Sequence, residues 1–150
     1  MKPDFARSLL HQALAELARA RAHLDYSFEQ VRALPDDLKD ATAEQLESVE
    51  AFSSRFARTV DLLVNKALRS LDRVELLPQG TLLDVVHRAE KRGLIDRAED
   101  LREMNDVRNV SAHDYAGAKA AEVITFCREQ KPTLDAMCDR VAAHARQLLP

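Results

Sequence analysis

The sequence has few of the residues that make turns. Its 150 residues include three glycines, five prolines and no tryptophan, against 23 alanines and 21 leucines. Glycine and proline punctuate turns, whereas alanine and leucine are among the best helix formers. The composition therefore excludes a β-sandwich or β-barrel and predicts an all-α fold.

Long apolar runs are also missing. The first residues, MKPDFARSLLHQ, do not have the basic, apolar and small-residue order of a signal peptide. We therefore expect a soluble cytoplasmic protein. A chain of this length can bury a substantial core but has no room for a second full domain, so we expect one domain over residues 1–150.

The charge is small and unevenly distributed. The net charge of −3 argues against binding polyanions through bulk charge. Residues 36–50 contain six acids and one base, which leaves the rest of the chain at +2. Sixteen of the 22 cations are arginines. Their planar guanidinium groups suit bidentate phosphate recognition, although surface ion pairs would favour arginine equally.

Apolar residues spaced three and four apart predict five helical segments, joined by short links into an antiparallel bundle. The first is expected to begin at Asp4, as an N-cap behind Pro3. Its apolar positions are Leu10, Leu14, Leu17, Leu24, Phe28 and Val31. An acidic loop is expected over residues 34–42.

The second segment has the cleanest apolar period in the chain. Its apolar positions are Val49, Phe52, Phe56, Val60, Leu63, Ala67, Leu71 and Val74. Thr42, with Gln45 three residues later, predicts a capping box at its start, and Pro78–Gly80 predicts its stop. Basic residues also recur at helical spacing in this segment and form a stripe. The face of an amphipathic helix opposite the core is ordinarily charged, so we expect this stripe to be a solvated face. This stripe consists of Arg55, Arg58, Lys66, Arg69 and Arg73.

Two shorter segments follow. The third is expected to begin at the cap Thr81 and to end at Lys91, with Gly93 as the C′ residue. The fourth is expected over about 95–111.

The last helical segment follows Gly117 and keeps one apolar phase across Pro132. Because proline removes a backbone donor and clashes with the preceding turn, we expect a kink or two nearly collinear helices there, not a turn-back. Cys127 and Cys138 lie eleven residues apart in this segment, which is about 16 Å along a helix. They are too far apart to form a disulfide, so we expect both to be small core residues.

Motifs for metals and phosphate loops are missing. The sequence has no CxxC, HExxH, acidic calcium loop, glycine-rich loop or GxSxG. Four histidines lie on separate segments, where surface or packing roles are more common than metal binding: His11, His23, His87 and His144.

One polar cluster stands apart, at residues 105–115. It combines a fixed cation, a side chain that titrates near neutral pH, amides, a hydroxyl and a phenol. On a straight helix Arg108 and His113 lie about 140° apart. The helix must therefore end before His113 and turn it back, or the two side chains must converge across a subunit interface. Spacing alone also allows a helix C-cap with a histidine on its dipole.

The cluster resembles the Arg-x4-His-x-Tyr signature of the HEPN superfamily, most closely its HepT branch. The matching residues are Arg108, Asn109, His113 and Tyr115. A looser similarity lies in the second segment, where 55–59 (RFART) and Lys66 are similar to an arginine–phenylalanine, threonine, apolar, lysine pattern of that branch. The helix order and chain length agree as well, so the resemblance covers essentially the whole chain and implies a HEPN-like bundle.

The resemblance implies metal-independent cleavage of RNA, such as tRNA or mRNA, without a cofactor. It does not imply DNA as a substrate. His113 would act as the base on a ribose 2′-OH, because imidazole titrates near working pH. Arg108 would stabilise the charge on the phosphorane oxygens. Asn109 would orient His113 or a phosphate oxygen, with Ser111 in support, and the products would be a 2′,3′-cyclic phosphate and a 5′-OH end.

The resemblance also implies a partner. In the HepT branch the tyrosine of the motif, here Tyr115, accepts AMP from an MNT-type nucleotidyltransferase antitoxin, which adds charge and bulk beside the site. A structural role, with the phenol hydroxyl on a neighbouring carbonyl, stays open for Tyr115. No membrane is implied as a partner.

A second function is compatible with the same bundle. Some relatives are non-catalytic, substrate- or nucleotide-binding subunits that partner a small nucleotidyltransferase. The intact motif favours the ribonuclease, whereas the acidic residues 36–50 favour the binding subunit or, equally, a surface that docks an antitoxin. We further expect a homodimer with the motif helices at its two-fold interface, because Arg108 and His113 diverge on one straight helix.

Overall fold

The computed structural model describes residues 2–107 and 118–149, and this part of the chain forms helices and no strand. The elements are α1 (Pro3–Val31), α2 (Ala43–Asp61), η1 (Leu62–Leu68), α3 (Arg69–Val74), α4 (Leu82–Lys91), α5 (Ala98–Asp106) and α6 (Ala118–Leu148). The π-helix η1 joins α2 to α3 without a break, so these three elements form one rod. The described residues thus contain the five helical segments predicted from the apolar period.

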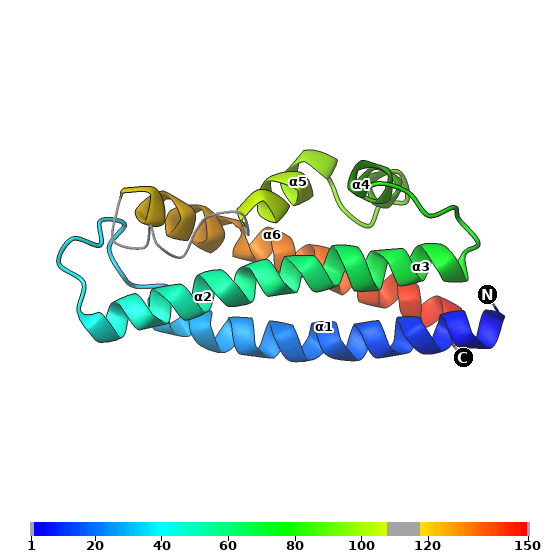
Figure 1. The fold of residues 1–150 in the computed structure, drawn as a ribbon, viewed down its shortest axis with the longest axis horizontal. Coiled ribbons are helices and arrows are strands. Elements are labelled where there is room, and N and C mark those ends of the chain that lie inside the picture. The colour runs from blue at the N-terminus through cyan, green and yellow to red at the C-terminus, as the bar shows by residue number, and fades with distance from the viewer. Residues whose placement is uncertain (1, 108–117, 150) are drawn as a thin grey trace.

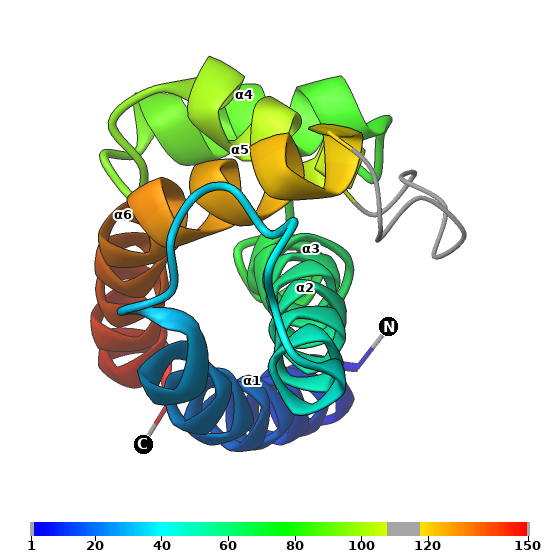
Figure 2. The same ribbon diagram turned by 90° about the vertical axis from the view of Figure 1, so that its left-hand side faces the viewer.

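The long segments pack lengthwise (Figure 1). The α1 helix and the α2–η1–α3 rod run antiparallel, α6 lies against both, and the short helices α4 and α5 cover the remaining side. Figure 2 shows α1, the rod, α5 and α6 arranged around the bundle axis. The beginning of α1 and the end of α6 lie at the same end of the bundle.

The start of α1 differs from the prediction. The helix begins at Pro3, and Lys2, in extended conformation, is the N-cap, so Asp4 lies inside the first turn and is not the cap. Proline is well suited to the first helical position, because its missing N–H would be unpaired there anyway. Asp4 still favours the helix, since a carboxylate stabilises the positive end of the helix dipole.

The core lies between α1, the rod and α6. Phe52 and Phe56 are completely buried, with ring centroids 6.3 Å apart, and Phe28 of α1 approaches Phe52 at 5.9 Å. Leu10 and Leu24 of α1 are also completely buried. Truncating one of these phenylalanines to alanine typically costs about 3–5 kcal/mol of stability.

The rod begins as predicted, with a full capping box between Thr42 and Gln45. The π-helix in its middle was not predicted. Residues 62–64 of η1 are all buried, and so are residues 70–72 of the regular helix α3. The rod therefore has packed neighbours on more than one face along this stretch.

The rod ends at Val74, before the predicted stop at Pro78–Gly80. Leu76 has a φ of 61°, in the left-handed region. The Leu77 N–H donates to the Asp72 carbonyl at 2.8 Å and the Leu76 N–H donates to the Arg73 carbonyl. This is the Schellman arrangement, with a leucine in the position that glycine usually occupies.

The caps of α4 follow the prediction, whereas the start of α5 does not. Thr81 and Asp84 form a capping box, and Gly93, with a φ of +74°, follows the C-cap Arg92. The α5 helix begins at Ala98, not near Ile95. Leu94 and Ile95 are buried in the link between the helices, so their apolar character reflects burial and not helical position.

Buried charges tie the shorter elements to the rod. The Asp72 side chain is 1% exposed and accepts from Arg88 at 2.9 Å and from Arg92 at 2.6 Å, both from the α4 end. Glu75 pairs with His144 of α6 at 2.5 Å. These contacts join α3 to α4 and α6.

The α6 helix continues through Pro132 without turning back, as predicted. Its chain direction changes along its length, and Figure 2 shows this change clearly. Cys127 and Cys138 are free and completely buried, as expected from the sequence. No helix of the described residues is both long and apolar enough to cross a membrane.

Candidate functional site

The motif residues predicted from the sequence lie outside the described residues: Arg108, Asn109, Ser111, His113 and Tyr115. The predicted extension of the fourth helix to Ser111 and the expected break at Gly117 fall in the same segment. The roles of these side chains and the convergence of Arg108 with His113 therefore stay predictions. The described residues show where the segment is attached.

Both attachment points are in the hydrophobic core. On the α5 side, Leu101 and Met104 are completely buried, and Val107 packs against the core while its N–H donates to the Met104 carbonyl. On the α6 side, Ala120 and Ile124 are buried. On either side of residues 108–117, the described residues of α5 and α6 are thus held by packing.

A hollow of about 310 Å³ lies beside the α5 attachment point. It is lined by Glu103, Asp106, Val107 and Phe126. Nearby, the Asn105 Oδ1 atom is buried and has no hydrogen-bond partner among the described residues. A buried acceptor without a partner costs about 1–3 kcal/mol, so this site can accept a hydrogen bond from a suitable donor.

The acidic loop is held against the first half of α6. Arg128 of α6 donates to the carbonyls of Val31 and Leu34, at 3.0 and 2.6 Å, and pairs with Asp36 at 2.6 Å. A second hollow, of about 590 Å³, lies between this loop and α6. Its lining includes four carboxylates, which belong to Asp36, Asp37, Glu122 and Glu129.

The basic stripe of the rod does not form one solvated face. Arg69 donates to Asn65 Oδ1 and to the Gly80 carbonyl, at 3.2 and 2.9 Å, which ties the rod to the start of α4. Lys66 is exposed on η1. Arg55 and Arg58 instead face α1, so the packing divides the stripe.

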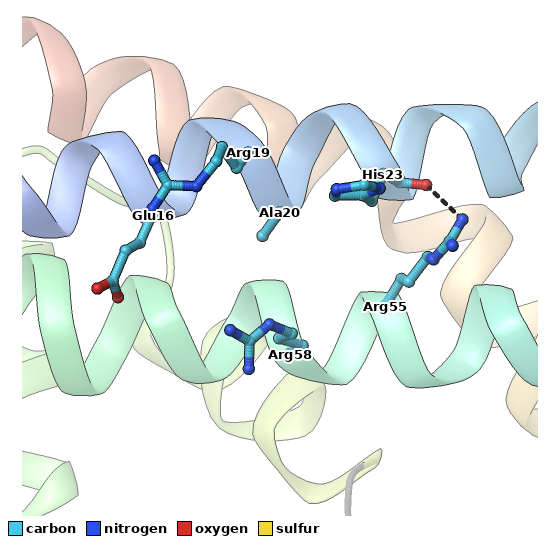
Figure 3. A pocket seen from close by; sticks show the side chains of 6 residues that line it. All are labelled: Glu16, Arg19, Ala20, His23, Arg55 and Arg58. Carbon is cyan, nitrogen blue, oxygen red and sulfur yellow. Dashed lines mark hydrogen bonds between the residues drawn. The ribbon is translucent and has the colours of Figure 1, made fainter.

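A groove between α1 and α2 is lined by basic side chains from both helices (Figure 3). We call it the α1–α2 groove; its volume is about 380 Å³, and it is lined by Glu16, Arg19, Ala20, His23, Arg55 and Arg58. Arg55 NH1 donates to Ser27 Oγ at 2.7 Å and to the His23 carbonyl at 3.2 Å. Figure 3 shows the side chains of Arg19 and His23 on one helix and those of Arg55 and Arg58 on the other.

The second patch of resemblance, around residues 55–66, has mostly structural contacts. Phe56 is in the core, and the Thr59 hydroxyl donates to the Arg55 carbonyl at 2.8 Å. Arg55 links α2 to α1 through the hydrogen bonds to Ser27 and His23. Of this pattern, Arg55 and Arg58 line a hollow next to α1.

The remaining histidines and the cysteines do not form a reactive cluster in the described residues. His11, His23 and His87 are exposed and His144 is half-buried. Burial raises the pKa of the Cys127 thiol to about 12, and burial is also the main cause that raises the pKa of Cys138 to about 12. No three His, Cys, Asp or Glu side chains of the described part are placed to hold a metal ion.

The order and packing of the described helices define an all-helical bundle of the HEPN-like type. The family model described as Ribonuclease HepT-like matches residues 12–141. The chain therefore belongs to the HepT-like ribonuclease family. No curated protein and no solved structure matches the sequence.

Sequence reasoning missed the α1 side of the groove. It singled out Arg55 and Arg58, but it did not name Arg19 and it assigned His23 only a surface or packing role. These two residues are four apart, so they share one face of α1. That spacing was a usable signal, but the period of one helix does not say which face of a second helix packs beside it.

Proposed function

We propose that this chain is an endoribonuclease toxin that cleaves RNA without a metal ion, using the Arg-x4-His-x-Tyr segment. The observation that carries the proposal is the family match over residues 12–141, which includes Arg108, Asn109, His113 and Tyr115. The proposed chemistry belongs to residues 108–117, which follow the packed end of α5 and precede α6.

In the proposed reaction His113 takes the proton of a ribose 2′-OH while the 2′ oxygen attacks the adjacent phosphorus. The bond between phosphorus and the 5′ oxygen breaks, and the proton held by His113 is available to that leaving oxygen. Arg108 stabilises the negative charge that builds on the phosphorane oxygens, where a guanidinium in a dry site lowers the barrier by several kcal/mol. Asn109 and Ser111 support the geometry, and the products are a 2′,3′-cyclic phosphate and a 5′-OH end.

The regulation proposed for this toxin uses a cognate MNT-type nucleotidyltransferase antitoxin. Transfer of AMP to the Tyr115 oxygen, with release of pyrophosphate from ATP, adds a negative phosphodiester group and a bulky nucleoside beside His113. Both features repel or exclude an RNA phosphate. The acidic hollow between the 34–42 loop and α6 is a candidate docking surface for such a partner.

The experiment is a cleavage assay on total RNA with EDTA present. We expect His113→Ala and Arg108→Ala each to abolish cleavage, whereas His87→Ala and Arg7→Ala, which change exposed residues of the same types, should cleave like the unaltered chain. The fragments should carry 2′,3′-cyclic phosphate ends. Cleavage that survives either motif substitution contradicts the assigned roles. An unaltered chain that cleaves no RNA, but binds a nucleotide with its partner enzyme, would favour the non-catalytic subunit instead.

A further inference from the structure

The α1–α2 groove contains cations that the proposed chemistry does not use. We propose that this groove binds the phosphodiester backbone of single-stranded RNA, as a substrate-holding surface outside the Arg-x4-His-x-Tyr segment. The inference rests on the proposed ribonuclease function for the identity of its ligand. It rests on the described geometry for the site itself.

The groove contains several of the arginines that have no carboxylate partner. Eight arginines of the described chain form ion pairs with carboxylates: Arg7, Arg21, Arg32, Arg88, Arg92, Arg102, Arg128 and Arg140. Seven described arginines have no such pair among the described residues, and three of these line the groove: Arg19, Arg55 and Arg58. The other four lie elsewhere: Arg69, Arg73, Arg97 and Arg146. Three guanidinium groups without carboxylate partners thus face one hollow.

Glu16 is the one carboxylate of the lining, and no described cation lies within ion-pair distance of it. In Figure 3 its carboxylate lies at the end of the groove away from Arg55. The lining therefore keeps a net positive charge of +2 with His23 neutral. A polyanion is the class of ligand that this charge favours.

Arg55 is fixed in position before any ligand binds. Its NH1 donates to Ser27 Oγ at 2.7 Å and to the His23 carbonyl at 3.2 Å, while its other N–H groups have no partner in the described chain. A guanidinium group has five donors, so several stay available for phosphate oxygens. Because its orientation is already set, less side-chain entropy is lost on binding.

The shape of the groove suits a chain that lies along the two helices. Ala20 is buried and lies between Arg19 and His23, so the small side chain leaves room for a ligand there. Arg19 and His23 lie one turn apart on α1, and Arg55 and Arg58 lie nearly one turn apart on α2. Cations thus line both walls, which favours a phosphodiester backbone over a single carboxylate.

The test uses an RNA that binds but cannot be cleaved. A single-stranded oligonucleotide of 2′-O-methyl ribonucleotides has no free 2′-OH, so its affinity is measured by fluorescence anisotropy without turnover. For single strands, the logarithm of the binding constant falls with the logarithm of salt concentration by about 0.7 per phosphate contact. We expect Arg19→Gln/Arg58→Gln to bind more weakly and to flatten this slope by about 1.4.

The matched control is Arg7→Gln/Arg32→Gln, which removes the same charge from two exposed arginines outside the groove, one in α1 and one at its C-cap. We expect it to keep the slope of the unaltered chain. Both double variants should fold, which thermal melts would verify, because the substituted side chains are exposed. Equal slopes for the groove and control variants would overturn the inference. The inference would also be wrong if the groove variant kept the slope of the unaltered chain but had a different sedimentation coefficient, because the groove would then contact protein and not RNA.

Failure of this inference can be told from failure of the ribonuclease proposal. If the groove variant flattens the slope but the unaltered chain cleaves no RNA, the groove is a nucleic-acid site and the proposed chemistry is wrong. If His113→Ala abolishes cleavage but the groove variant binds RNA normally, the chemistry stands and the groove inference is wrong.

Discussion

Replacing Asp72 with asparagine should destabilise the bundle strongly. The carboxylate is 1% exposed and accepts from two arginines, Arg88 and Arg92, which are themselves 23% and 16% exposed. Asparagine has the same shape, but it offers one acceptor oxygen and turns an amide NH₂ group toward the second guanidinium. Two cations then share a poorly solvated site with no carboxylate at position 72 to balance them.

The expected loss is about 3 kcal/mol. Removing one partner of a buried ion pair costs about 3–5 kcal/mol, and the lower end applies because both arginines keep some contact with water. For a chain of this size the melting temperature should fall by about 6–12 °C. Urea unfolding followed by circular dichroism measures the free energy directly.

The control for this experiment is Asp4→Asn. Its carboxylate is fully exposed and lies 3.9 Å from Arg7, so the substitution should lower the free energy of unfolding by no more than the about 0.3–1 kcal/mol of an exposed charge at a helix start. A loss below about 1 kcal/mol for Asp72→Asn would show that the Asp72 contacts do not hold α4 to the rod.

Four further outcomes are expected. Incubation with the cognate nucleotidyltransferase, Mg²⁺ and ATP should add AMP to Tyr115 and stop RNA cleavage, and Tyr115→Phe should stay active and unmodified; added mass that persists in Tyr115→Phe would contradict this. The chain should sediment as a dimer at micromolar concentration, and a monodisperse monomer would count against motif segments paired at a two-fold interface. Leu76→Gly should raise the unfolding free energy by about 0.5–1 kcal/mol in urea titrations, because the left-handed conformation strains leucine and not glycine; a loss of stability would refute this. Because burial raises the pKa of Cys127 and Cys138 to about 12, neither thiol should react with a thiol reagent at pH 8 until the chain unfolds; rapid labelling of the native chain would be inconsistent with that burial.

Local signals explain which parts of the fold could be predicted. The capping residues Thr42 and Thr81 and the C′ residue Gly93 act through neighbours only a few positions away, so the sequence predicts them correctly. The burial of Phe52 and Phe56 follows from a helical period. These features depend on short-range geometry and on one hydrophobic face.

The features that the sequence did not predict have a common physical reason. Each depends on neighbours that are distant in the sequence. The π-helix η1 escaped prediction because the apolar spacing passes through Leu63 and Ala67 in ordinary steps of four. Ile95 was assigned to a helix because apolar character does not distinguish a buried link from a buried helix face. Arg55 and Arg58 are separated from the rest of the basic stripe because they face α1. The apolar period of the second segment does not show which helix packs beside these two arginines.

The candidate site was found in two different ways. Arg108 and His113 were found by resemblance, because the diagnostic spacing is short and contiguous, and their mutual geometry stays a prediction. The α1–α2 groove was found from packing alone. Its residues Arg19 and His23 have ordinary neighbours in the sequence and become noticeable only beside α2.

The position of the two chain ends determines where a tag or a tether can be fused to the protein without covering the motif region. The start of α1 and the end of α6 lie at one end of the bundle, whereas Ala118, where α6 begins, lies at the other. The α6 helix has 31 residues from Ala118 to Leu148, a length on the order of 40 Å. An affinity tag, a fluorescent protein or a surface tether can thus be fused at either end far from the beginning of α6, so labelled forms of the chain should behave like the free one in the RNA-binding and cleavage assays proposed above.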